Sequence, residues 1–123
     1  VTKNSYSKCA CRNRPLFAGC NGRQSSVSGQ IPVDPATGTM AQGIEAQARQ
    51  VFKNIGAILS EAGLGMGNIV KTTVYLKSMA DFQTVNGIYA EYINGEILPA
   101  RCAMQVGALP EDSLIEVECI AVK

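Results

Sequence analysis

Residues 114–122, near the C-terminus, constrain the fold more than any other segment. Their side chains alternate in character, which predicts a β-strand. One face of this strand is entirely apolar: Ile115, Val117, Cys119 and Ala121. The other face mixes apolar residues with two carboxylates: Leu114, Glu116, Glu118, Ile120 and Val122. A strand with apolar residues on both faces needs cover on both. In a chain of 123 residues the second cover is most simply another subunit, so we expect an oligomer.

Upstream, apolar side chains recur at spacings of three and four over residues 44–62, which predicts an amphipathic helix. Gly63 stands where a helix C-cap is expected. Residues 69–76 form a second predicted strand, whose shared face holds Val70, Thr72, Val74 and Leu76. A second helix is expected over residues 79–93, with an apolar stripe of Phe82, Val85, Ile88, Tyr89 and Tyr92.

Helices that alternate with strands in a chain of this length favour one α+β domain over residues 1–123. We expect a single mixed β-sheet with both helices packed on one face. The other face of the sheet would then be left for a neighbouring subunit to cover.

Composition excludes several function classes. The chain has no histidine, which removes imidazole acid–base catalysis, Ser-His-Asp chemistry and His-ligated metals. The net charge of +1 offers little support for nucleic-acid binding. No apolar run reaches the about 18 residues that span a bilayer, and residues 1–5 lack a secretory apolar region. We therefore expect no membrane association and a cytoplasmic location, with the mitochondrial matrix as an alternative after import.

Cysteines do not suggest a metal site or a disulfide framework. Their total of five is odd, and Cys9, Cys11 and Cys20 lack a nearby fourth ligand. Free thiols and no metal or other cofactor are the expectation.

Charged residues inside apolar strand runs mark a candidate site. Arg101 stands in the alternating segment 98–106, and Glu116 and Glu118 stand in the last strand. A guanidinium and a carboxylate in a sheltered place could hold a small carboxylate substrate and orient a water molecule. A structural Arg–Glu pair at a subunit interface would explain the same residues, and composition alone does not separate the two.

These same residues carry a family resemblance. Pro99-Ala100-Arg101, then Leu109-Pro110 and Ile115-Glu116-Val117-Glu118, resemble the signature of the RidA/YjgF family, as does Ser28-Gly29-Gln30-Ile31-Pro32. The resemblance covers about residues 28–123. It implies a trimer of chorismate-mutase-like subunits that hydrolyses reactive enamines and imines, such as 2-iminobutanoate and 2-iminopropanoate, to 2-keto acids and ammonia. The substrate would be a small imino acid, and no cofactor would be required.

The resemblance also assigns roles to residues. Arg101 would bind the substrate carboxylate, Glu116 would orient the attacking water or act as general base, and the hydroxyl of Tyr6 would lie near the imine. By motif match Glu118 has no such role, and an exposed or rim-paired carboxylate is the simpler interpretation.

Four further residues are expected to bind substrate. Ser28 and Gly29 match the loop that lines the family's cleft, and Asn86 matches an asparagine that faces the neighbouring subunit's cleft. Cys102 follows Arg101 directly, but strand alternation directs its thiol to the opposite face. Because the family cysteine falls where this chain has Ala103, we do not expect a cysteine nucleophile.

Residues 1–26 fit the family pattern poorly. The segment 8–26 is rich in Cys, Arg, Asn and Ser and is longer than the resemblance predicts. An insertion or a reading-frame error would both produce this pattern. The sequence leaves open whether this segment forms the family's N-terminal hairpin.

Two alternatives to the deaminase function stay open. The chain could be a non-catalytic trimeric protein that binds small carboxylates or acts like a chaperone. It could also cleave RNA and inhibit translation, as has been linked to the family, although it lacks a basic stripe.

Overall fold

The computed structural model describes residues 18–20 and 23–123. In this part of the chain a five-stranded sheet is covered by two helices. The helices are α1 (Ile44–Glu61) and α2 (Phe82–Tyr92). In spatial order, the strands are β1 (Ala18–Cys20), β2 (Gln24–Gln30), β5 (Ile115–Val122), β3 (Ile69–Leu76) and β4 (Ala100–Gln105). Short 3₁₀ helices span Met66–Asn68, Met79–Asp81 and Pro110–Asp112.

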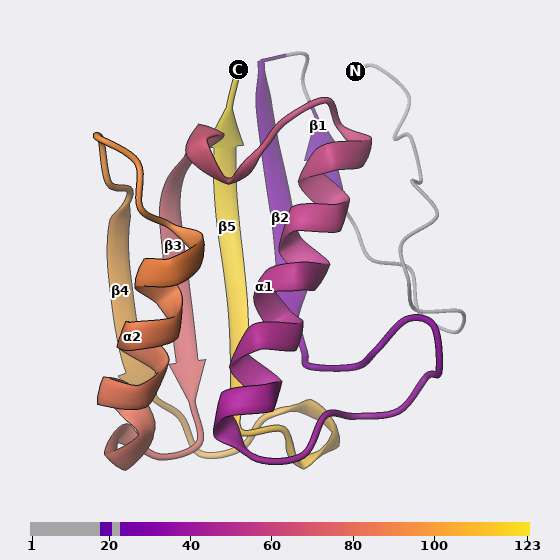
Figure 1. Ribbon diagram of the computed structural model, residues 1–123, viewed down its shortest axis with the longest axis vertical. Helices are drawn as coiled ribbons and strands as arrows, with labels where there is room; N and C mark the ends of the chain where they lie inside the picture. The colour runs from indigo at the N-terminus through magenta and orange to yellow at the C-terminus, as the bar shows by residue number, and fades with distance from the viewer. Residues whose placement is uncertain (1–17, 21–22) are drawn as a thin grey trace.

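The sheet is mixed, as predicted. β3 and β4 pair in parallel, whereas β1 pairs with β2, and β5 with both β2 and β3, in antiparallel fashion. Both helices lie on one face of the sheet, with α1 near β2 and β5 and α2 near β3 and β4 (Figure 1). The core lies between the helices and this face. In the described part of the chain, no helix is long and apolar enough to cross a membrane.

Register fixes which side chains point to the helices. On β5 these are Ile115, Val117, Cys119 and Ala121, all buried as expected. On β3 the buried face includes Thr72, Val74 and Leu76, but the prediction that Val70 shares it is wrong. The pairing with β5 shifts between Ile69 and Lys71, so Ile69 is buried and Val70 is 47% exposed. A bulge of this kind reverses the alternation on one side of it.

The first helix matches its prediction closely. It ends at Glu61, and Gly63 follows with a φ of 74°, a left-handed conformation that glycine adopts without strain. The second is shorter than predicted, because Met79–Asp81 form a 3₁₀ turn in which the Ser78 hydroxyl accepts a hydrogen bond from the Ala80 N–H.

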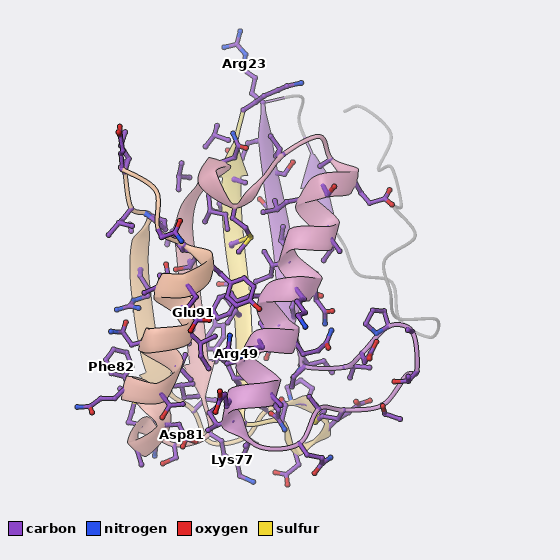
Figure 2. The ribbon with its side chains drawn as sticks, viewed as in Figure 1. Arg23, Arg49, Lys77, Asp81, Phe82 and Glu91 are labelled. Carbon is purple, nitrogen blue, oxygen red and sulfur yellow. The ribbon has the colours of Figure 1, made fainter. Side chains whose placement is uncertain are left out.

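The two helices are joined by aromatic and ionic contacts. The ring of Phe52 on α1 meets Tyr89 edge-to-face at 5.7 Å and stacks on Tyr92 at 5.4 Å. Beside them, Arg49 donates to Glu91 with an Nη1–Oε2 distance of 2.5 Å (Figure 2). These contacts hold α2 at a set distance from α1 above β3 and β4.

The N-terminal hairpin that the sequence left open is present in part. Ala18–Cys20 pairs with residues 25–27, so β1 extends the sheet beyond β2. The opposite sheet face, which we call the open face, carries no helix from residues 18–20 or 23–123. It presents Lys71, Thr73 and Tyr75 from β3 and Glu116 and Glu118 from β5.

Candidate active site

Arg101 projects from the edge strand β4 toward the helices. It pairs with Thr72 across the parallel β3–β4 ladder, and Thr72 faces the core. Its guanidinium donates through Nη1 to Oδ1 of Asn86 on α2 at 2.6 Å. The Cζ atom lies 4.6 Å from the centre of the Tyr89 ring and 5.6 Å from that of Phe82. Such cation–π geometry orients the guanidinium plane.

The charge of Arg101 is available to a ligand. Among the described residues, no carboxylate lies within salt-bridge distance of it, and the residue is exposed. Asn86 occupies one of its five N–H groups, which leaves a donor edge for a planar anion. A carboxylate is an anion that this edge fits in size and shape.

Glu116 lies on the open face, against the backbone of Gly29. The pairing of β2 with β5 shifts between Val27 and Gln30, so Ser28 and Gly29 lie at a bulge beside it. A Cβ atom on Gly29 would clash with the carboxylate of Glu116 and lie 2.9 Å from its Cδ atom. Only glycine leaves the space that this carboxylate occupies.

Two shallow hollows flank Glu118 on the open face. One, of about 340 Å³, is lined by Gly29, Tyr75, Val106, Ala108, Leu109, Glu116 and Glu118. The other, of about 300 Å³, lies between Ser26, Ser28, Lys71 and Thr73. Each is large enough for a small organic acid but open to its surroundings.

Burial and a neighbouring charge on the open face both raise the pKa of Glu116. Partial burial raises the pKa of its carboxyl above the ordinary value, and the negative charge of Glu118 raises it further. Glu118 itself accepts a hydrogen bond of 3.0 Å from the hydroxyl of Tyr75. Burial, and then this hydrogen bond, raise the pKa of Tyr75. A carboxyl with a raised pKa is suited to take up and return a proton.

The two halves of the site lie on opposite faces of the sheet. Arg101 pairs in register with Thr72, which faces the helices, whereas Glu116 pairs with Tyr75 on the open face. They are separated by two strand spacings and three residues along the strands, which places their backbones about 14 Å apart. A four-carbon acid cannot contact both side chains of one chain.

The structure places the remaining predicted residues as follows. Asn86 contacts Arg101 of its own chain. Cys102 is exposed and pairs in register with Thr73, so its thiol points away from Arg101, as alternation predicted. Tyr6 lies outside the described residues.

Sequence reasoning missed the contacts of two tyrosines. Tyr89 was predicted only as a core residue, yet its ring also makes a cation–π contact with the Arg101 guanidinium. Tyr75 was not singled out, although period-two alternation places it with Lys71 and Thr73 on the face of Glu116. In the part of the chain that the structure describes, no group of three or more potential ligands could hold a metal ion.

Comparison with known proteins identifies the family. The Endoribonuclease L-PSP family model matches residues 3–123. The chain belongs to this family. Two curated relatives are named 2-iminobutanoate/2-iminopropanoate deaminase. The one from Rattus norvegicus is 52% identical over 120 residues, which cover 97% of this chain and 80% of that protein. The one from Salmonella typhimurium is 48% identical over 104 residues, which cover 83% and 81%. The resemblance to RidA/YjgF is thereby confirmed.

Solved structures of L-PSP proteins share the fold. The YjgF gene product from E. coli superposes with a TM-score of 0.83 at 42% identity, covering 92% of this chain and 91% of that one. E. coli TdcF, solved with bound serine, gives a TM-score of 0.84 at 37% identity, with 89% of each chain covered. The predicted fold class, one mixed sheet with two helices on one face, is confirmed.

Proposed function

We propose that this protein hydrolyses small 2-imino acids, such as 2-iminobutanoate and 2-iminopropanoate, to 2-keto acids and ammonia. The observation that carries the proposal is the pair of half-sites. One presents an oriented guanidinium with no carboxylate partner among the described residues, and the other presents a carboxyl of raised pKa in a hollow. Relatives of about 50% identity bear the name of this activity, and a solved relative holds serine, which also carries a carboxylate.

Arg101 binds the substrate carboxylate in this proposal. Two parallel N–H groups of its donor edge would hold the two carboxylate oxygens, a contact worth about 1.5–3 kcal/mol. Asn86 keeps one corner of the guanidinium in place. The imine carbon next to the carboxylate is thereby held at a set distance from Arg101.

Glu116 handles the proton. A water molecule beside its carboxylate loses a proton to it as the water oxygen bonds to the imine carbon. That proton passes to the imine nitrogen, which gives an intermediate with a hydroxyl and an amino group on one carbon. The hydroxyl proton then moves by way of Glu116 to the amino nitrogen, the C=O bond forms as the C–N bond breaks, and ammonia and the 2-keto acid leave. Ser28 and Gly29 line this side, and the missing Cβ of Gly29 lets the substrate approach the backbone.

The working site is formed between two copies of the chain. Because Arg101 and Glu116 lie on opposite faces, the Arg101 half of one copy would complete the Glu116 half of the next. A head-to-tail interface closes into a ring when the rotation between copies divides a full turn, and we propose the homotrimer expected from the resemblance. The ring would also cover the open face.

A mixing experiment tests both the activity and the shared site. Arg101→Ala and Glu116→Gln chains should each keep no more than about a tenth of the wild-type activity toward freshly generated 2-iminobutanoate, measured as released 2-ketobutanoate and ammonia. Co-expressed in equal amounts, they should recover about a quarter of the wild-type activity, because one site in four receives both intact halves. No recovery, or a monomeric elution volume for the wild type, would contradict the shared site.

The proposal also includes three further expectations from the sequence, on the domain, Tyr6 and Cys102. Residues 1–123 act as one domain, the hydroxyl of Tyr6 lies near the imine, and the thiol of Cys102 lines the Glu116 side of the cleft. The cytoplasmic location stays a prediction. A wild-type oligomer that binds 2-ketobutanoate without accelerating imine hydrolysis would favour the carboxylate-binding alternative. Cleavage of RNA that persists in Arg101→Ala and Glu116→Gln would favour the ribonuclease alternative.

A further inference from the structure

The aromatic ring closest to the Arg101 guanidinium, that of Tyr89, makes a buried hydrogen bond through its own hydroxyl group. The hydroxyl of Tyr89 is hydrogen-bonded to that of Thr72 at 2.8 Å. Thr72 is fully buried and Tyr89 is 8% exposed, so water does not compete for this bond. Phe52 packs edge-to-face on the same ring. The ring of Tyr89, which α2 bears, is therefore held by contacts from two other elements, α1 and β3.

Thr72 and Arg101 are also cross-strand partners on the parallel β3–β4 ladder. Thr72 therefore contacts both the backbone of Arg101, as its ladder partner, and the Tyr89 ring beside the Arg101 guanidinium. Because β4 has a neighbour on one side only, its position against α2 depends on side-chain contacts such as the Arg101–Asn86 hydrogen bond. The Thr72–Tyr89 bond ties α2 to the strand that β4 pairs with.

We propose that Tyr89, held in place by Thr72, is a positioning residue that sets the orientation of the Arg101 guanidinium for a carboxylate ligand. This rests on the proposed function insofar as the ligand is the substrate carboxylate. The guanidinium has one amide contact, to Asn86, and no anionic partner among the described residues. Besides that bond, the nearest support for its plane is the Tyr89 face, at 4.6 Å, with Phe82 the more distant ring.

Three substitutions separate the hydrogen bond from the packing. Thr72→Val removes the hydroxyl but keeps the shape, Thr72→Ser keeps the hydroxyl, and Tyr89→Phe keeps the ring. Tyr92→Phe is the matched control, because Tyr92 is on the same helix and stacks on Phe52 but has no contact with Arg101.

The first readout is the dissociation constant for 2-ketobutanoate, the product, with its neutral amide as a control ligand. Thr72→Val and Tyr89→Phe should weaken 2-ketobutanoate binding about three- to tenfold, whereas Thr72→Ser and Tyr92→Phe should leave it within about twofold. Binding of the amide should not change. In turnover assays, KM for 2-iminobutanoate should rise by the same factor while kcat stays near its wild-type value.

The second readout does not depend on activity. The Arg101 side-chain protons above the Tyr89 ring should show upfield-shifted NMR signals, which Arg101→Lys removes and so assigns. Thr72→Val should move these signals toward ordinary values, and Thr72→Ser should restore them. Unchanged signals and unchanged 2-ketobutanoate affinity in both Thr72→Val and Tyr89→Phe would overturn the positioning role. A wild type that shows the shifted signals but no imine hydrolysis would refute the proposed function alone.

Discussion

The carboxylate of Glu116 occupies the space in which a side chain on Gly29 would lie. Gly29→Ala should therefore push the carboxylate out of the hollow. We expect kcat for imine hydrolysis to fall about a hundredfold, which is the scale of an ångström-sized misplacement of a reacting group. Gly67→Ala is the control, because a Cβ atom there meets nothing within 4 Å. Equal activity in the two variants would mean that the Glu116 position is not critical.

Replacing Arg101 should weaken substrate binding without unfolding the protein. Its side chain is exposed and its contacts are to Asn86 and two rings, so the core does not depend on it. We expect Arg101→Ala to lower kcat/KM about 10- to 150-fold or more. Arg101→Lys keeps the charge but loses the planar donor edge, and should recover only part of this loss. Circular dichroism and elution volume check that the assembly is intact.

The charge of Glu118 should set the pH range of activity. Because this charge helps to raise the pKa of Glu116, Glu118→Gln should lower that pKa toward its ordinary value. If Glu116 is the base, the acid limb of the kcat/KM profile then moves to lower pH. A limb that stays in place, or moves to higher pH, would exclude Glu116 as the titrating group.

The same raised pKa has a consequence for stability. Above the ordinary carboxyl pKa, folded Glu116 binds more protons than the unfolded chain does, so stability is lost as the pH rises through the folded pKa. Glu116→Gln should therefore raise Tm at neutral pH while removing activity, and should have little effect below about pH 4. Calorimetry at both pH values is the test. A lower Tm at neutral pH would show that the carboxylate stabilises the fold.

Two glycines should respond to alanine with opposite signs. Gly87 lies exposed within α2, where a Cβ atom meets nothing, so Gly87→Ala should stabilise by about 0.5–1 kcal/mol. Gly63 has a φ of 74°, and Gly63→Ala should destabilise by about 1 kcal/mol. Denaturant unfolding with unchanged m-values measures both.

Cys102 and Cys119 should differ in reactivity. Cys102 is exposed, whereas burial and the nearby Glu118 raise the pKa of Cys119 to about 12. Iodoacetamide should modify Cys102 well before Cys119 in the native protein, as read by peptide mass mapping. Comparable rates at the two thiols would imply local opening of β5.

Much of this architecture is predictable because alternation and helical spacing are strong signals here. The bounds of β3 agree with the prediction at both ends, and those of α1 to within a residue. Val70 was misplaced because a bulge depends on how two strands pair, which no local pattern in β3 reveals. Alternation along β4 also correctly predicted that the side chains of Arg101 and Cys102 point to opposite faces of the sheet.

The contacts of the site were harder to foresee. The resemblance predicts that Asn86 faces the cleft of a neighbouring subunit, and it did not indicate the bond that Asn86 makes to Arg101 of its own chain. That contact depends on how α2 is rotated about its axis over β4, which tertiary packing sets and the local sequence does not. Tyr89 was predicted as a core residue for the same reason. Its place in the apolar stripe indicates that it is buried, but not that its ring also contacts a guanidinium.

In the proposed shared site, the division of Arg101 and Glu116 between two faces of one sheet would make the catalytic rate depend on protein concentration. If each site needs two chains, dilution below the dissociation constant of the ring lowers the activity per chain as well as the total. For a trimer, the amount of active assembly would then fall as the third power of the free chain concentration. A cell making little of this protein would have almost no activity, and a modest increase in synthesis would switch it on steeply.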